Sequence, residues 1–381
     1  MKKYRPFISG IIVGVFVAIA LIYMCGGGIM APGRRDYYTG LDKAYGKYYE
    51  IIELIDEEAL AEYDPEKITD KVLKKVVAGL EDPYAQYYTA EEYEQFLKRY
   101  AKSYVGVGVT IVDKDDEVRI INVVEDSPAE EAGLLRDDVI LAVDGDKVEN
   151  SDDAVGKIAG ESGTEVKVTI ERDGSEKEFA VNRGKVVSKS VEYKELDKKN
   201  GIGYIKVSSF KTDTAKEFKL AVKDLKNANF TKLIIDLREN GGGSTDEAYK
   251  IADMLLPECE MLKEYNNKGE ERVRKSDSTT IGMDYVLLVC ENSASASEMV
   301  SGAVKDNKGG KLIGVKTFGK GVTQKTTKFK DGSALKITIE EFKRPSGKAI
   351  NEVGIDPDIV VRDVHNNKKI LSIAKKELMK K

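Results

Sequence analysis

Two residues of this sequence have the types and the setting for hydrolytic chemistry: Ser295 and, 25 residues later, Lys320. Apolar residues recur at helical spacing after Ser295, which predicts that a helix begins there with the serine at its N-terminus. A serine becomes a nucleophile when a neighbouring base takes its proton. The single histidine, His365, lies in a polar segment near the C-terminus. Lysine is the remaining candidate for the base, and the pair indicates a hydrolase that activates serine with lysine.

A lysine base must lose its proton near neutral pH, whereas the reference pKa of lysine is about 10.4. The pKa must therefore fall by roughly three pH units, which corresponds to desolvation on the order of 4 kcal/mol. Gly319 and Gly321 flank Lys320 and allow close backbone packing around its amine. The sequence thus predicts that this amine is buried.

The same segments also allow interpretations without such a pair. Residues 295–298 fit a Ser-x-x-Glu capping box, and serine commonly caps helices. Residues 314–320 read as the start of a phosphate-binding P-loop, but Gly321 stands where that motif needs Ser or Thr, and a β-rich segment follows. The glycine loop Asn240–Ser244 could present backbone N–H groups to an oxyanion, or it could be an ordinary strand-to-helix turn.

The composition argues against several other classes of function. The 61 basic and 66 acidic residues give a net charge of -5, which leaves no general basic footprint for nucleic acid. Cys25, Cys259 and Cys290 lie far apart without a Cys/His cluster, so we expect no metal site. The sequence alone does not decide whether Cys259 and Cys290 form a disulfide.

The elements that must position Ser295 and Lys320 begin near Val186. Strand and helix patterns alternate from there, which indicates an α/β core with largely parallel strands. In such sheets, sites form at the carboxyl ends of the strands. The glycine loop and the serine segment each follow an apolar strand directly. We therefore expect both at that edge of the sheet.

Residues 103–185 contain short strands around small helices, with turns at Asp144-Gly145 and Asp173-Gly174. This segment resembles a PDZ domain, a family that binds the C-termini of peptides. Gly106, Val107, Gly108 and Val109 stand in the place of its carboxylate-binding loop. Glycines let backbone N–H groups converge on an anion, and the following strand can accept an extended peptide. The alternative is that the glycines only permit a twisted strand entry.

The N-terminus contains 18 uncharged residues, 7–24, after a basic start. This length and this flank predict a single-pass anchor in the cell membrane, with the N-terminus in the cytoplasm and everything after residue 35 outside it. A signal peptide cleaved near residues 26–28 and a lipid-modified Cys25 are the alternatives. Residues 37–102 carry apolar residues at helical spacing and are predicted to be helical.

Several motifs in order resemble those of the C-terminal processing peptidases, or tail-specific proteases: the PDZ-like segment, IDLRENGGGS, ENSASASE, TFGKGVTQ, RPSGKAI and GIDPDIVV. The resemblance covers about residues 37–361. It implies an α/β protease core of the crotonase/Clp-protease type with an inserted PDZ domain. The implied domains are an anchor with its cytoplasmic tip (1–35), a helical N-terminal module (36–102), the PDZ domain (103–185), the protease core (186–365) and a C-terminal helix (366–381).

The resemblance also assigns roles to residues. It makes Ser295 the nucleophile and Lys320 the general base, and it implies that Gln324 orients the lysine. The oxyanion donors would be Ala296 and a glycine of the loop, Gly243 or Gly242. Gly241 departs from the family because many members have proline there.

The implied function is a serine endopeptidase that cleaves extracytoplasmic proteins after its PDZ domain recognises their unstructured C-terminal tails. Neither a cofactor nor a metal is implied. Residues 7–24 would be the contact with the membrane, and a homodimer through the helical module and the last helix stays open. The rival interpretation is a catalytically silent PDZ scaffold on the same membrane.

Overall fold

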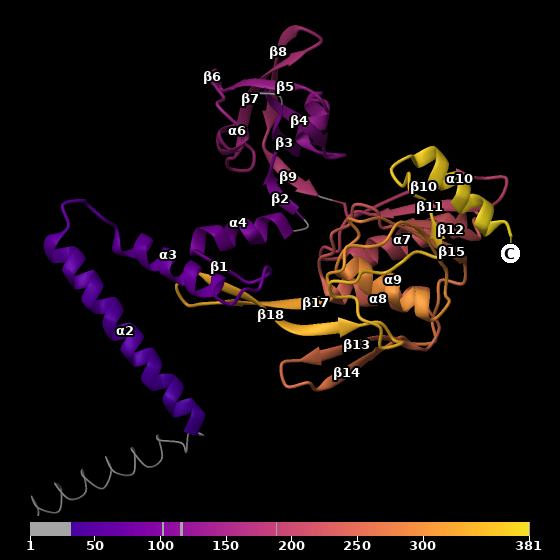
Figure 1. Cartoon of the computed structure of the whole chain (residues 1–381). Coiled ribbons are helices and arrows are strands. Elements are labelled where there is room, and N and C mark those ends of the chain that lie inside the picture. Colours follow the sequence, from indigo (N-terminus) through magenta and orange to yellow (C-terminus); the bar gives the residue numbers. More distant parts are fainter. Residues whose placement is uncertain (1–31, 101–102, 115–116, 188, 381) are drawn as a thin grey trace, which may run out of the picture. The chain divides into compact units, whose positions relative to one another are not determined.

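The computed structural model describes residues 32–100, 103–114, 117–187 and 189–380 (Figure 1). The chain divides into two compact units, residues 1–71 and 72–381. The predicted anchor, residues 7–24, lies outside the described residues. Among the helices of the described ranges, none combines the length and the apolar character that a membrane crossing needs.

The described part of the first unit consists of α2 (Pro32–Glu58) and the beginning of α3 (Pro65–Ala78). Tyr48 Oη and Thr69 Oγ1 lie 3.1 Å apart and connect the two helices. Large apolar side chains of α2, such as Tyr49 and Leu54, remain exposed. The prediction of helices is confirmed for α2, for α3 and for α4 (Ala90–Tyr100) of the second unit.

The helical prediction is wrong for residues 86–88. These residues form strand β1 (Gln86–Tyr88), which pairs with β18 (Ala334–Lys343) in antiparallel register. The pairing buries Tyr87 and Tyr88, which are only 7% and 3% exposed. The partner strand lies far along the sequence, so the local periodicity of residues 37–102 could not indicate it.

The central sheet of the second unit has six strands in the order β10-β11-β12-β15-β16-β19 (Figure 1). β10 is antiparallel to β11, and all the other neighbours are parallel. The strands are β10 (Val191–Asp197), β11 (Ile202–Val207), β12 (Lys232–Asp236), β15 (Asp284–Val289), β16 (Lys311–Gly314) and β19 (Ile359–Val360). The α/β core with largely parallel strands is therefore confirmed.

Helices cover both faces of this sheet. Leu233 and Ile235 of β12 pack into the apolar cluster of α7 (Thr214–Asn227), α8 (Thr245–Leu255) and α9 (Ala296–Asp306). Ile234 points the other way, into the cluster of α10 (Asn367–Leu378). Because β12 and β15 are parallel neighbours, the loops that follow them leave from the same edge of the sheet.

A second sheet carries the strand that follows Lys320. It is built on β18, which pairs with β1, β17 and β13, and β13 also pairs with β14. The remaining bounds are β17 (Val322–Lys328), β13 (Glu260–Asn266) and β14 (Glu271–Lys275). Because β17 directly follows Lys320, the helix that a P-loop requires is absent from this described segment, and the P-loop interpretation is wrong.

The PDZ-like segment forms a sheet of its own in the order β3-β4-β5-β7-β8, with β6 beside β5. A separate pair, β2 with β9, joins the start of the segment to its end. The elements are β2 (Ser103–Gly106), β3 (Val109–Lys114), β4 (Glu117–Val123), α5 (Pro128–Ala132), β5 (Val139–Val143), β6 (Asp146–Lys147), α6 (Ser151–Ile158), β7 (Glu165–Arg172), β8 (Ser175–Asn182) and β9 (Gly184–Val187). Both predicted turns are confirmed, since Asp144-Gly145 and Asp173-Gly174 have positive φ at both positions, as type I′ hairpins require.

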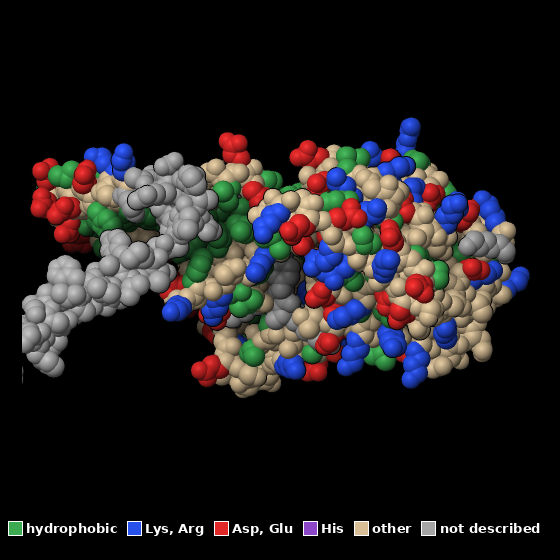
Figure 2. Space-filling view, turned by 90° about the horizontal axis from the view of Figure 1, so that it is seen from below, with side chains coloured by type: hydrophobic (Ala, Val, Ile, Leu, Met, Phe, Trp, Pro, Cys, Tyr) green, Lys and Arg blue, Asp and Glu red, His purple; other side chains and the backbone are tan. Residues whose placement is uncertain are grey.

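Lys and Arg side chains are interspersed with Asp and Glu side chains on the face that Figure 2 shows. This distribution agrees with the near balance of charges in the composition.

Candidate active site

Ser295 lies between β15 and α9, and its backbone conformation differs from that of an ordinary helix cap. Capping residues normally have extended backbones, whereas Ser295 has φ 54° and ψ −110°. Such angles cost a non-glycine residue of order 1–3 kcal/mol, and strained residues of this kind cluster at active sites, ligand clamps and switch regions. The main chain is held on both sides, by the Ala294 N–H on the Asn240 carbonyl oxygen at 3.0 Å and by the Ser295 N–H on Glu298 at 2.8 Å.

Glu298 is the residue that joins the serine segment to the lysine segment. Its side chain is fully buried. Oε2 accepts the backbone N–H groups of Ser295 and Lys320, each at 2.8 Å. Oε1 accepts the Thr317 hydroxyl and the Gly319 N–H, each at 2.7 Å. Burial raises the pKa of Glu298, although these four donors oppose the rise.

The sequence indicated Glu298 only as half of a capping box, and its function as a connector was missed. One signal was available: the residues around it, from Ala296 to Val304, are almost all small or apolar, and all of them are buried in the structure. A glutamate in such a run needs several donors, because an unpaired buried carboxylate is very costly. The partners themselves, at 317–320, could not be read from spacing.

Lys320 is half-buried, and its Nζ lies over the ring of Tyr84, 4.4 Å from the ring centroid. Burial lowers its pKa, the charge of Lys336 lowers it further, and Asp82 and Glu298 oppose the shift. The expected close backbone packing is confirmed on both sides. A Cβ at Gly319 would lie 3.1 Å from a backbone nitrogen of Gly354, and one at Gly321 would lie 2.2 Å from the nitrogen of Asn351.

Gln324 lies on β17, one element away from Lys320. Its Nε2 donates to Thr338 Oγ1 at 3.2 Å and more weakly to the Val322 carbonyl at 3.4 Å. Among the described residues, these are the partners that the structure gives the amide, and a hydrogen bond to Lys320 is not one of them. The orienting role that the resemblance implies stays a prediction.

The glycine loop reaches the serine after β12. A Cβ at Gly242 would lie 3.0 Å from Ser295 Cβ and 3.1 Å from the Ala296 nitrogen, so the loop backbone is packed against Ser295. Gly242 has φ 105° and Gly243 has φ 139°, conformations that favour glycine. The prediction that the loop and the serine segment share one edge is confirmed.

The hydrogen bonds of this loop distinguish its two candidate oxyanion donors. The Gly242 N–H is occupied, since it donates to Asn240 Oδ1 at 2.9 Å. The Ser244 N–H donates to the Phe210 carbonyl at 2.7 Å. No acceptor among the described residues takes the N–H of Gly243. Of the two candidates, Gly243 is therefore the one whose N–H stays available, near Ala296 at the start of α9.

His365 and the possible disulfide between Cys259 and Cys290 lie outside this cluster of contacts. His365 is 61% exposed at its side chain and lies 3.3 Å from Glu291 and 3.6 Å from Glu239, so it is engaged at the surface with carboxylates. Cys259 and Cys290 are both free thiols. The disulfide that the sequence left open does not form, because Cys259 lies beside Ser276 whereas Cys290 contacts Glu239.

The loop expected to bind a peptide carboxylate lies at the start of β3, an edge strand of its sheet. The Val107 carbonyl accepts the Ala129 N–H and the Gly108 carbonyl accepts the Val124 N–H, each at 2.8 Å. Gly108 has φ 95°, and a Cβ there would lie 2.4 Å from Ser127 Cβ. Within the part of the chain that the structure describes, β3 has a strand neighbour on one side only, which suits strand addition by a peptide.

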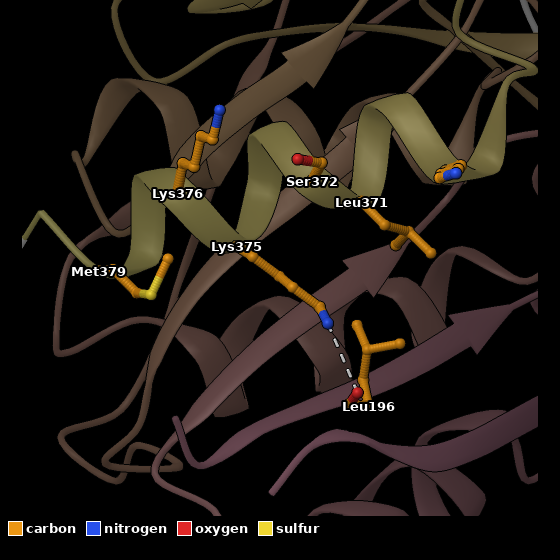
Figure 3. Close-up of a pocket in the computed structure, with 7 residues that line it drawn as sticks. Leu196, Leu371, Ser372, Lys375, Lys376 and Met379 are labelled. Carbon is orange, nitrogen blue, oxygen red and sulfur yellow. Dashed lines mark hydrogen bonds between the residues drawn. The ribbon is translucent and has the colours of Figure 1, made fainter. Parts of the chain in front are cut away.

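A surface pocket of about 420 Å³ lies elsewhere, between α10 and β10 (Figure 3). Lys375 reaches across it, and its Nζ donates to the Leu196 carbonyl at 3.5 Å and lies 3.4 Å from Asp197. Because α10 covers the opposite face of the sheet from α9, this pocket is separate from Ser295.

Comparison with known proteins shows the family. A model of peptidase family S41 matches residues 201–361, and a PDZ domain model matches residues 105–182. A probable CtpA-like serine protease of Staphylococcus aureus strain MRSA252 is 34% identical over 371 residues, which cover 95% of this chain and 73% of the relative. The chain belongs to peptidase family S41. The prediction of a serine-type peptidase is thus confirmed at the level of the family.

Other S41 relatives show how far the likeness extends. A probable CtpA-like serine protease of Staphylococcus aureus strain COL is 35% identical over 333 residues, covering 85% of this chain and 66% of the relative. The chain therefore spans about two thirds of the length of such relatives. The solved structure of a photosystem II D1 C-terminal processing protease is 26% identical with a TM-score of 0.51, covering 83% of this chain and 86% of that one. A putative S41 protease of Bacteroides fragilis shares the fold, with a TM-score of 0.57 and 19% identity over 84% of this chain and 92% of that one.

Proposed function

We propose that this S41 chain is a serine endopeptidase in which Ser295 is the nucleophile and Lys320 is the base. One observation carries the proposal: the backbone N–H groups of both residues converge on one carboxylate oxygen of Glu298. This contact holds the two segments together in the fold. The lowered pKa of Lys320 has the direction that a neutral base requires.

The mechanism follows from the groups present. Neutral Lys320 takes the proton of the Ser295 hydroxyl as the oxygen attacks a peptide carbonyl. The developing oxyanion accepts hydrogen bonds from the N–H groups of Ala296 and Gly243, where the start of α9 also favours negative charge. The protonated lysine gives its proton to the leaving amine, and water then resolves the acyl-enzyme. Gln324 orients the lysine if its amide turns from Thr338.

The PDZ domain supplies substrate selection in this proposal. The edge strand β3 adds the C-terminal tail of a substrate as a further strand, and the loop at 106–109 binds its terminal carboxylate. An unstructured tail fits because a strand must be extended to pair. Tail binding moves the PDZ domain and completes the dyad. Residues 7–24 anchor the chain in a membrane, with the peptidase outside the cytoplasm.

The test uses the full chain in detergent and a fluorogenic peptide with an apolar, unstructured C-terminus. Ser295→Ala and Lys320→Ala should each lower kcat by about a thousandfold or more. Ser372→Ala, an exposed serine on α10, is the matched control and should cleave at the rate of the unaltered chain. Cleavage by both dyad variants at that same rate would exclude the dyad.

The rival class is a PDZ scaffold without catalysis. It predicts that the unaltered chain binds the peptide and leaves it intact under every condition. Binding measured by fluorescence anisotropy, next to cleavage measured by mass spectrometry, separates the two. The strained backbone of Ser295, which is held by its hydrogen bond to Glu298, favours the enzyme. A scaffold without catalysis has no need of a strained serine.

A further inference from the structure

Tyr84 contacts the proposed base although it belongs to neither strand nor helix of the protease core. The Lys320 Nζ lies 4.4 Å from the centroid of the Tyr84 ring. A cation over an aromatic face is attracted by the ring quadrupole. Burial raises the pKa of Tyr84, and the negative charges of Glu298, Asp82 and Glu352 raise it further, so the phenol stays neutral. The ring therefore offers Lys320 a fixed, uncharged support.

Asp82, two residues earlier, reaches the other half of the site. Its Oδ2 accepts the Thr338 N–H at 3.3 Å. The Thr338 hydroxyl in turn accepts the Gln324 amide at 3.2 Å. Thr338 and Gln324 face each other across β18 and β17. One short turn thus contacts Lys320 through a ring and Gln324 through a threonine.

The turn itself is fixed locally. Asp82 Oδ1 accepts the Tyr84 N–H at 2.9 Å, and the Asp82 carbonyl accepts the Ala85 N–H at 3.1 Å. Pro83 restricts the backbone between them. Strand β1 follows at once and pairs with β18 in the register Gln86↔Lys336, so the turn cannot slide along the sheet. Its two side chains are presented from a rigid support.

We infer that the Asp82–Tyr84 turn is the positioning element of the dyad, with Tyr84 locating the amine of Lys320 and Asp82 locating Gln324 through Thr338. This inference rests on the proposed function. The ring face favours the ammonium form and fixes its location without a hydrogen bond. Among the described residues, no hydrogen bond or ion pair holds Nζ, so movement of the amine from the ring toward Ser295 breaks the ring contact alone.

The charged and titratable groups that face Lys320 come from three elements besides its own. They are Asp82 and Tyr84 of the turn, Lys336 of β18 and Glu298 of α9. Different substitutions at Tyr84 remove either the aromatic ring alone or the whole side chain that shields the amine from solvent, while Asp82, Lys336 and Glu298 remain. The two kinds of substitution should therefore shift the pH profile differently, which a turn with a purely structural role would not cause.

The experiment measures kcat, KM and the pH profile of kcat/KM for the full chain with the fluorogenic peptide. Tyr84→Phe keeps the ring and should retain activity within about twofold. Tyr84→Leu keeps the apolar cover but removes the ring, so kcat should fall about tenfold with KM little changed, and the acid limb should move to lower pH. Tyr84→Ala exposes the amine, so its acid limb should move to higher pH.

Tyr93→Leu is the matched control, since Tyr93 is a half-buried tyrosine of α4 that stacks on Phe96. It should leave the acid limb in place. An unshifted limb together with undiminished kcat in Tyr84→Leu would overturn the inference. So would equal losses in Tyr84→Phe and Tyr84→Leu, which indicate a hydroxyl or folding effect instead of the ring. Thermal melts of every variant identify those that fail to fold.

The second arm tests Asp82. Asp82→Ala alone should lower kcat about tenfold. Added to Gln324→Ala, it should lower kcat little further, because the effects of residues that act through one another are not additive. Additive losses would overturn this half. If Ser295→Ala and Lys320→Ala retain activity, the proposed function itself fails. If they abolish activity while the Tyr84 and Asp82 variants behave like the unaltered chain, only the inference fails.

Discussion

Ser295 and Lys320 donate their backbone N–H groups to the same atom, Oε2 of Glu298, each at 2.8 Å. Two nitrogens that share one acceptor lie within twice that distance of each other. The backbones of the proposed nucleophile and base are therefore coupled by a single buried carboxylate. Whatever displaces Glu298 must displace both.

Glu298→Gln should damage stability and catalysis together. Each oxygen of the carboxylate accepts at least one backbone N–H group. In glutamine, an NH₂ group replaces one of these oxygens and cannot accept a hydrogen bond. Whichever way the amide is turned, at least one backbone N–H therefore loses its acceptor. A buried donor left unsatisfied costs about 1–3 kcal/mol. We expect the melting temperature to fall by several degrees and kcat to fall at least tenfold, measured by calorimetry and by peptide turnover.

Glu247→Gln is the matched control for that substitution. Glu247 is also buried at the start of a helix, where it accepts the Ala215 N–H at 2.8 Å. Its loss should lower the melting temperature while kcat at a temperature well below melting stays unchanged. Equal losses of kcat in both variants would show that Glu298 has no special connection to the dyad.

The rate of cleavage should rise with pH as Lys320 loses its proton. Because burial holds the pKa of Lys320 below the ordinary value for lysine, the acid limb of kcat/KM should lie below that value. Lys336 contributes to this lowering through its positive charge. Lys336→Gln should therefore raise the pKa of Lys320 and move the acid limb to higher pH, in steady-state assays across the pH range.

Lys325→Gln provides the comparison, because Lys325 is an exposed lysine of neighbouring β17. Its removal should leave the limb unmoved. A shift of the same size in both variants would mean that net charge, and not the position of Lys336, controls the base.

Gly243→Ala should remove most of the activity. A Cβ there would lie 2.3 Å from the Phe210 carbonyl oxygen, and φ 139° disfavours any other residue. The loop would have to move and would withdraw the proposed oxyanion donor; loss of such a donor typically costs 10² to 10³ in kcat, or about 2.7–4 kcal/mol. Gly241→Ala meets nothing within 4 Å and should keep nearly full kcat. Comparable kcat values for the two variants would contradict the assignment of Gly243.

Much of this site could be predicted from the sequence, because its parts follow local signals. Ser295 follows an apolar strand and precedes a helical stripe, and Lys320 stands between two glycines. Tyr84 could not be predicted, since its contact with Lys320 depends on the pairing of β1 with β18 across most of the chain. The arrangement of the Gln324 amide was also beyond the sequence, because a side-chain rotamer depends on neighbours such as Thr338.

Cleavage of tailed substrates should depend on a free terminal carboxylate at the loop before β3. Gly108→Ala places a Cβ 2.4 Å from Ser127 Cβ at φ 95°, so the loop must distort and its N–H groups no longer converge. We expect kcat/KM for a peptide with a free C-terminus to fall about tenfold. Amidation of that peptide should produce a similar loss in the unaltered chain and little further loss in Gly108→Ala. If amidated and free peptides are cleaved equally by the unaltered chain, the loop does not read the carboxylate, and strand addition along β3 must act without it.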